Sequence, residues 1–112
     1  MFEQLPDEWI MCVREWAEQK VELQAIYVFG SRAKGCANIE SDLDLAVVTK
    51  GSSQDRLDFA MFEGNAWKEE LRLTLPVRLD FQFADPIADT VVWPAVVDHG
   101  LFIAGEDIRL AN

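Results

Sequence analysis

Gly30-Ser31-Arg32-Ala33-Lys34-Gly35, followed after a short gap by Asp42-Leu43-Asp44, is the stretch that decides how this sequence folds. It comes directly after residues 25–29, an apolar run that is typical of a buried strand and that stops at a glycine. Such a turn presents backbone N–H groups, a hydroxyl and two cationic side chains in one place, which suits anionic phosphate oxygens. The sequence therefore predicts a phosphate-binding turn, whose candidate ligands are Gly30, Ser31, Arg32 and Lys34.

The two aspartates lie on a second predicted strand, over residues 42–48. Because side chains alternate along a strand, Asp42 and Asp44 face one side and Leu43 faces the other. Two neighbouring carboxylates repel each other, and a bound cation offsets that repulsion. Mg²⁺ prefers carboxylate oxygen and keeps water and substrate phosphates as its other ligands. The pair therefore predicts a magnesium site, although Asp-x-Asp alone is more often a solvated strand face.

A third carboxylate comes from residues 76–83, where apolar residues alternate with Arg78, Asp80 and Gln82. This alternation places Asp80 on the polar face of a third strand. If this strand pairs beside the Asp42/Asp44 strand, three carboxylates converge. Three carboxylates can hold two Mg²⁺ ions in a phosphoryl-transfer site.

The turn, the gap, the Asp-x-Asp pair and the later Asp80 together resemble the DNA polymerase β-type nucleotidyltransferase superfamily. The residue sequence of the turn and the short length of the chain resemble those of its minimal nucleotidyltransferases (MNT). This resemblance extends over roughly residues 22–104. The resemblance implies an α/β (α+β) fold, with a small mixed β-sheet backed by helices. It also implies that Gly30 and Ser31 bind a nucleoside triphosphate, that Asp42, Asp44 and Asp80 bind metal, and that Asp80 activates the attacking hydroxyl. Arg32 and Lys34 would add charge neutralisation.

The same resemblance implies transfer of a nucleoside monophosphate from a triphosphate, with ATP as the expected donor, to a hydroxyl group. Similar minimal nucleotidyltransferases act as antitoxins of helical HEPN-type toxins, so the leading expectation is a separately encoded HEPN-type partner as acceptor. One alternative is a small hydroxyl compound, as in the aminoglycoside nucleotidyltransferases. Another is a non-catalytic module that neutralises a helical partner by binding it.

Composition limits the remaining possibilities. We expect a single domain over residues 1–112. The formal net charge of −10 argues against an extended surface that binds nucleic acid. Cys12 and Cys36 lack the spacing of a zinc or redox motif, and no segment resembles a signal peptide or a membrane span. A cytoplasmic protein is expected. The apolar residues around Trp93, or the helix carrying Trp9 and Trp16, are predicted to form a partner or self-association surface.

Three helices and a last strand complete the prediction. The first helix begins at Pro6 and Asp7, and the second runs from Ser52 or Ser53 to about residue 71, with its tryptophan in the core. The third opens at residues 85–86 and is expected to kink at Pro94, or to divide into two shorter pieces, before ending near His99, whose ring is expected to cap it. Residues 101–104 form the last strand.

Overall fold

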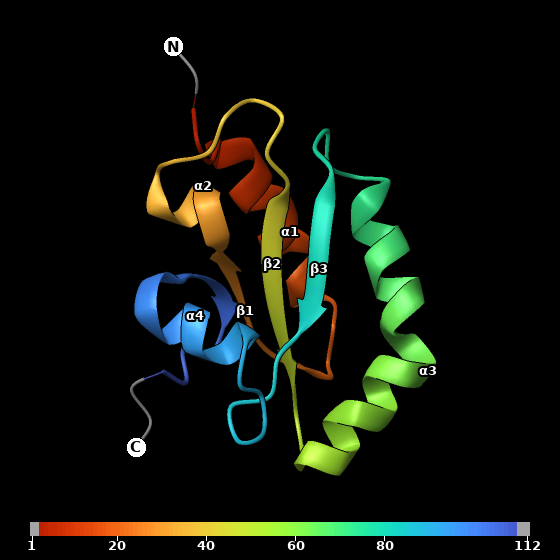
Figure 1. Ribbon diagram of the computed structural model, residues 1–112. Helices are drawn as coiled ribbons and strands as arrows, with labels where there is room; N and C mark the ends of the chain where they lie inside the picture. Colours follow the sequence, from red (N-terminus) through yellow and green to blue (C-terminus); the bar gives the residue numbers. More distant parts are fainter. Residues whose placement is uncertain (1–2, 110–112) are drawn as a thin grey trace.

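The computed structural model describes residues 3–109, which form one four-stranded mixed sheet with helices on both faces (Figure 1). The sheet order is β3-β2-β1-β4, in which β2 and β3 are parallel and the other pairs are antiparallel. This arrangement confirms the predicted fold class. In chain order the elements are α1 (Asp7–Glu18), β1 (Leu23–Phe29), α2 (Gly30–Lys34), β2 (Leu43–Thr49), α3 (Ser53–Arg72), β3 (Leu79–Phe83), α4 (Val92–His99) and β4 (Leu101–Gly105).

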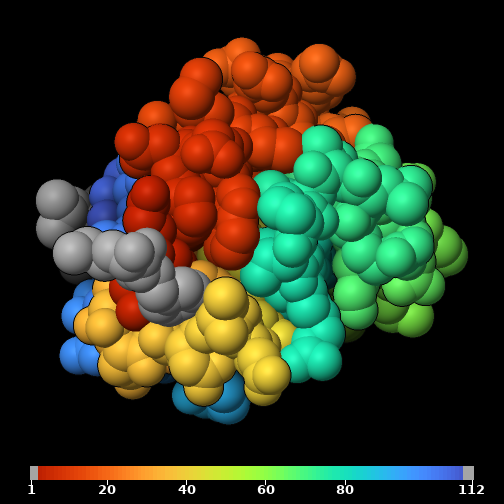
Figure 2. Space-filling view, turned by 90° about the horizontal axis from the view of Figure 1, so that it is seen from above, coloured from red at the N-terminus to blue at the C-terminus, as the bar shows by residue number. Residues whose placement is uncertain are grey.

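Alternation along β2 divides the core into two parts. Leu43, Leu45 and Val47 pack on the face covered by α1 and α3, together with Trp67 of α3. Ala46 and Val48 pack on the opposite face, against Tyr27 and the α4 residue Val96. Asp42 and Asp44 share this second face. Asp44 lies near the start of β2, and Asp42 immediately precedes this strand. Figure 2 looks onto this end of the sheet, where the segment before β2 and the turn before β3 lie beside α1.

Local sequence signals account for the ends of α1 and α3. Pro6 immediately precedes α1, as predicted, where its missing N–H costs no hydrogen bond. Ser52 caps α3 through a reciprocal pair, in which its hydroxyl accepts from the Asp55 amide and the Asp55 carboxylate accepts from the Ser52 amide. Trp67 is 5% exposed, which confirms its predicted place in the core. Among residues 3–109, no helix combines the length and the apolar character that crossing a bilayer requires.

The prediction of a third helix that opens at residues 85–86 and kinks at Pro94 is wrong. Residues 85–91 form turns, and the helix begins only at Val92. The Asp89 carboxylate accepts hydrogen bonds from the backbone amides of Val91, Val92 and Trp93 at 2.9–3.0 Å, and so starts the helix. Pro94 consequently lies in the first turn, where no intrahelical N–H is needed and no kink results.

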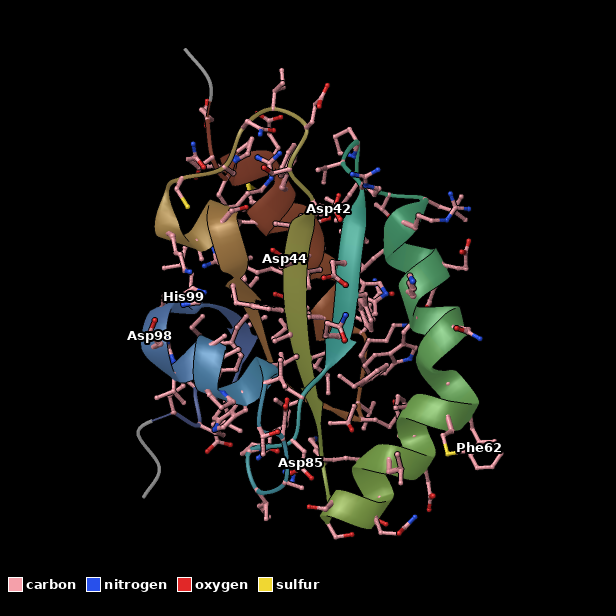
Figure 3. All side chains as sticks on the ribbon, in the orientation of Figure 1. Asp42, Asp44, Phe62, Asp85, Asp98 and His99 are labelled. Carbon is pink, nitrogen blue, oxygen red and sulfur yellow. The ribbon has the colours of Figure 1, made fainter. Side chains whose placement is uncertain are left out.

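The tryptophans predicted at a partner surface pack largely into the fold. Trp16 stacks edge-on against Trp67 with ring centroids 5.2 Å apart, and Trp93 meets Tyr27 at 5.8 Å. Large apolar side chains beside these rings stay exposed, among them Met11 of α1 at 58% and Val91, just before α4, at 75%. On α3, Met61 and Phe62 are exposed as well. Phe62 projects outward from this helix (Figure 3). The indole rings themselves therefore belong mainly to the core, and the partner surface beside them stays a prediction.

Candidate active site

The parallel pairing of β2 and β3 brings two of the predicted carboxylates together. In the register of these strands Asp44 pairs with Asp80, and Leu43 pairs with Leu79. Because residues in register on one face of a sheet point the same way, the two carboxylates meet on the face that also carries α4. The neighbouring position of these strands, on which the predicted site depended, is confirmed.

The electrostatics of this pair are those of two like charges held in contact. The pKa of Asp44 is raised from 3.8 to about 6, first because burial disfavours the charged form, and then because Asp80 supplies a hydrogen bond and a second negative charge. Asp80 is in turn oriented by Gln82, whose Nε2 donates to Asp80 Oδ1 at 2.7 Å. Without a cation the pair therefore retains a proton up to about pH 6. A divalent cation would replace that proton.

The carboxylate of Asp42 pairs with an arginine and not with the other two carboxylates. It forms an ion pair with the exposed guanidinium of Arg78, the residue just before β3. Within residues 3–109, no three His, Cys, Asp or Glu side chains gather closely enough to form a metal-binding group. The structure thus joins Asp44 to Asp80, while the convergence of all three carboxylates is not seen. Arg78 was overlooked as a site residue, although it shares the polar alternation of Asp80 two positions later.

The Gly30 turn lies directly against Asp44. Gly30 has φ +74°, and a Cβ atom built on it would fall 2.0 Å from Asp44 Oδ2. Only glycine fits here, because any side chain would collide with the carboxylate and would also be strained at this φ. The predicted turn proves to be a short helix, α2, which Gly35 ends in a left-handed conformation at φ +76°. The turn and the carboxylates therefore form one site.

The two cations of the turn point in different directions. Arg32 is 2% exposed, and its guanidinium donates to the carbonyl oxygens of Gln4 at 2.7 Å and Ser41 at 2.9 Å. It also stacks on the ring of Trp9, 4.9 Å from the centroid. These contacts make Arg32 a brace between α1, α2 and the segment before β2, so its phosphate role rests on the resemblance alone. Lys34 is exposed at the end of α2, and Ser31 is half-buried beside the Gly30 turn.

His99 was predicted at a helix end, and this position is confirmed. Its ring does not cap its own helix. Instead, the Gly30 amide donates to His99 Nε2 at 2.9 Å, and His99 Nδ1 lies 3.1 Å from an Asp98 carboxylate oxygen (Figure 3). Sixty-nine residues separate Gly30 from His99. No local pattern links them, so only the folded structure reveals the contact.

A surface hollow of about 680 Å³ lies on the α1 side of the sheet. Trp9, Arg32 and Val77 are among its lining residues, and none of the three carboxylates is. Arg78, the ion-pair partner of Asp42, also lines it. The hollow thus reaches the Asp42–Arg78 ion pair but does not include the Asp44–Asp80 pair.

Comparisons with known proteins agree with the fold. A family model described as "Polymerase beta, Nucleotidyltransferase" matches residues 12–109. No curated protein sequence matches the chain. Among solved structures, a toxin–antitoxin crystal structure with AMP-PNP has a TM-score of 0.62 and 24% identity, over 92% of this chain and 76% of that one.

Two further structures show the same fold. In the complex of a tri-AMPylated Shewanella oneidensis HEPN toxin with its MNT antitoxin, the TM-score is 0.58 at 21% identity, over 89% of this chain and 72% of the other. A putative nucleotidyltransferase from Sulfolobus solfataricus has a TM-score of 0.53 at 21% identity, over 88% and 78% of the two chains. Since the family model covers most of the sequence, the chain belongs to the polymerase beta nucleotidyltransferase family.

Proposed function

We propose that this chain transfers a nucleoside monophosphate from a nucleoside triphosphate, with ATP as the expected donor, to a hydroxyl group on a HEPN-type partner protein, and that it thereby acts as the partner's antitoxin. The observation that carries the proposal is the Asp44–Asp80 pair, which lies on adjacent strands against the Gly30 turn. The chemistry follows from the family. The partner and the acceptor are proposed from the likeness to toxin–antitoxin complexes, one of which contains an AMPylated toxin.

The chemistry of the donor set fits Mg²⁺. Asp44 and Asp80 present carboxylate oxygens to each other, and carboxylate oxygen is the ligand type that this ion prefers. Asp42 would join them after leaving Arg78, and the resemblance then implies room for two ions. When bound, Mg²⁺ would neutralise the phosphates and lower the pKa of the acceptor hydroxyl.

In the transfer itself, the acceptor oxygen forms a bond to the α-phosphorus, and the bond from that phosphorus to the bridging oxygen of pyrophosphate breaks. The carboxylate of Asp80 takes the proton of the hydroxyl, and Gln82 holds this carboxylate in place. The Gly30 turn allows the backbone to approach the phosphates closely, and Ser31 adds a hydroxyl donor. Positioning supplies much of the catalysis in such phosphoryl chemistry.

A second candidate function is a binding module that neutralises a helical partner without any transfer. The ion pair of Asp42 with Arg78 favours it, because it holds one predicted metal ligand away from the other two. On this reading the acidic surface and the exposed apolar side chains of α3 would carry the function, and the carboxylate pair would not be needed. Transfer to a small hydroxyl compound stays a further alternative within the enzyme class.

The test compares wild-type protein with the double variant Asp44→Asn, Asp80→Asn. Each is incubated with the purified HEPN-type partner and Mg-ATP, and the intact mass of the partner is measured. Glu22→Gln, an exposed charge removal between α1 and β1, is the matched control. We expect an AMP adduct on the partner with the wild-type and control proteins, and none with the double variant.

The toxicity assay then separates the candidates. If the double variant still binds the partner but no longer neutralises it, transfer carries the function. If neutralisation survives without any adduct, the binding module is correct. An active wild-type enzyme that modifies a small hydroxyl compound and leaves the partner unmodified would favour the aminoglycoside-type alternative.

A further inference from the structure

The C-terminal end of α4 reaches across to the Gly30 turn. The backbone amide of Gly30 is the first N–H of α2, and amides at this position have no acceptor within their own helix. Phe29, the preceding residue, has no side-chain oxygen or nitrogen that could accept this hydrogen bond. His99 Nε2 accepts it instead, at 2.9 Å, with the imidazole only 16% exposed. A side chain from a distant helix thus caps the helix that contains the predicted phosphate-binding turn.

This contact specifies how the imidazole is protonated. A backbone N–H can only donate, so Nε2 must be the unprotonated nitrogen of a neutral ring. The ring proton is then on Nδ1, which donates to the Asp98 carboxylate at 3.1 Å. Asp98 therefore selects the tautomer that presents an acceptor to Gly30.

The end of α4, from which the imidazole projects, is held by a chain of contacts. The Gly100 amide donates to the carbonyl of the buried residue Val96 at 2.8 Å, which holds the end of α4. The Gly100 carbonyl accepts from the Arg109 guanidinium, and Asp107 binds that same guanidinium at 2.7 Å. Asp107 also accepts from the hydroxyl of Tyr27, a fully buried residue of β1. The backbone that carries His99 is thus anchored to β1, a strand of the sheet that carries the carboxylates.

We propose that His99 is a positioning residue for nucleotide binding, in which its neutral imidazole holds the Gly30 amide and so keeps the Gly30-Ser31 turn against Asp44 in the shape that receives the triphosphate. The proposal rests on the proposed nucleotidyltransferase function. His99 contacts the turn and not the nucleotide. Because the Gly30 amide already donates its hydrogen bond to His99, it is not available to a phosphate. The first groups of the turn that can donate hydrogen bonds to a phosphate are the amide and the hydroxyl of Ser31.

The test uses a matched pair of variants, His99→Gln and His99→Met. The two new side chains have the same length and similar shape, but only glutamine carries a strong acceptor that can reach the Gly30 amide. Val97→Ala, an exposed change on the same turn of α4, is the control. Melting temperatures confirm that all the variants fold, so that later differences report on the contact.

The first measurement is hydrogen exchange of the Gly30 amide by NMR, in protein free of nucleotide. Losing one hydrogen bond should speed exchange by about 2- to 12-fold in His99→Met, the range expected for a single net hydrogen bond. Exchange in His99→Gln and Val97→Ala should stay near the wild-type rate. Unchanged exchange in His99→Met would show that the ring does not hold the amide, and would overturn the proposal.

The second measurement is the dissociation constant of Mg-ATP by calorimetry. We expect His99→Met to bind about 2- to 12-fold more weakly and His99→Gln to recover most of the affinity. Faster exchange with unchanged affinity would overturn the positioning role while leaving the proposed function intact, and so would equal losses in both His99 variants. Wild-type protein that binds no Mg-ATP would remove the proposed function, and this proposal with it, even if the exchange data confirm the contact.

Discussion

Replacing Asp44 with asparagine should stabilise the metal-free protein while it disables the site. The folded protein must hold the ionised Asp44 carboxylate in a half-buried place beside Asp80, which raises its pKa from 3.8 to about 6. A difference of about two pKa units corresponds to about 3 kcal/mol of lost stability once Asp44 is ionised in both states. Partial exposure screens this cost, so we expect Asp44→Asn to gain about 1–2 kcal/mol at pH 8.

The sign and the pH window follow from the same shift. Between pH 3.8 and about 6 the folded state binds more protons at Asp44 than the unfolded state does, so wild-type stability falls as the pH rises through this window. Asparagine does not titrate. The advantage of Asp44→Asn should therefore be full above pH 6, about half as large at pH 5, and absent well below pH 3.8.

The assay is urea unfolding followed by tryptophan fluorescence, in EDTA, at pH 8 and at pH 5. In a thermal melt of a domain of this size, the same gain in stability corresponds to a rise in melting temperature of about 4–10 °C at pH 8. Asp42→Asn is the matched control, because Asp42 is paired with Arg78 and its loss should give no such gain. An Asp44→Asn protein that is no more stable at pH 8, or whose gain is the same at pH 5, would refute the reasoning.

Three further predictions concern the turn, the brace and the metal. Gly30→Ala should destabilise the fold by about 2–3 kcal/mol through backbone strain and its clash with Asp44, and calorimetry should show weakened Mg-ATP binding; a stable variant with normal affinity would contradict the close approach. Arg32→Lys should cost about 2 kcal/mol in urea unfolding, because lysine lacks the planar fork whose Nη1 reaches Gln4 while Nε and Nη2 reach Ser41. An unchanged midpoint would remove the bracing role. Mg²⁺ at ten times its dissociation constant should stabilise the wild-type protein by about 1.4 kcal/mol in a thermal melt, and an equal shift in Asp80→Asn would exclude Asp80 as a ligand.

Much of the site could be predicted from local sequence because its parts repeat with the period of a strand. Alternation alone places Asp42 and Asp44 on one face of β2 and Asp80 on the polar face of β3. The glycine that ends β1 could be predicted to form a turn, and its φ of +74° explains why glycine is required there. The parallel pairing of β2 with β3 brings these local features together. It could be predicted only from the resemblance to the family.

Long-range contacts could not be predicted. The contact of His99 with Gly30 and the brace from Arg32 to Gln4 both depend on how distant elements dock, and no periodicity encodes them. The start of α4 was missed for a different reason. The Asp-Pro at residues 85–86 looks like a helix start, but the Asp89 carboxylate competes successfully as the cap by accepting from several backbone amides.

The central claim is that this chain moves a nucleoside monophosphate onto its partner. The most direct test incubates the chain and the purified HEPN-type partner with Mg²⁺ and ATP labelled at either the α- or the γ-phosphate. We predict that the partner gains the α-label, that it gains none of the γ-label, and that Asp44→Asn with Asp80→Asn abolishes the transfer. Transfer of the γ-label, or neutralisation of the partner with neither label attached, would contradict the claim.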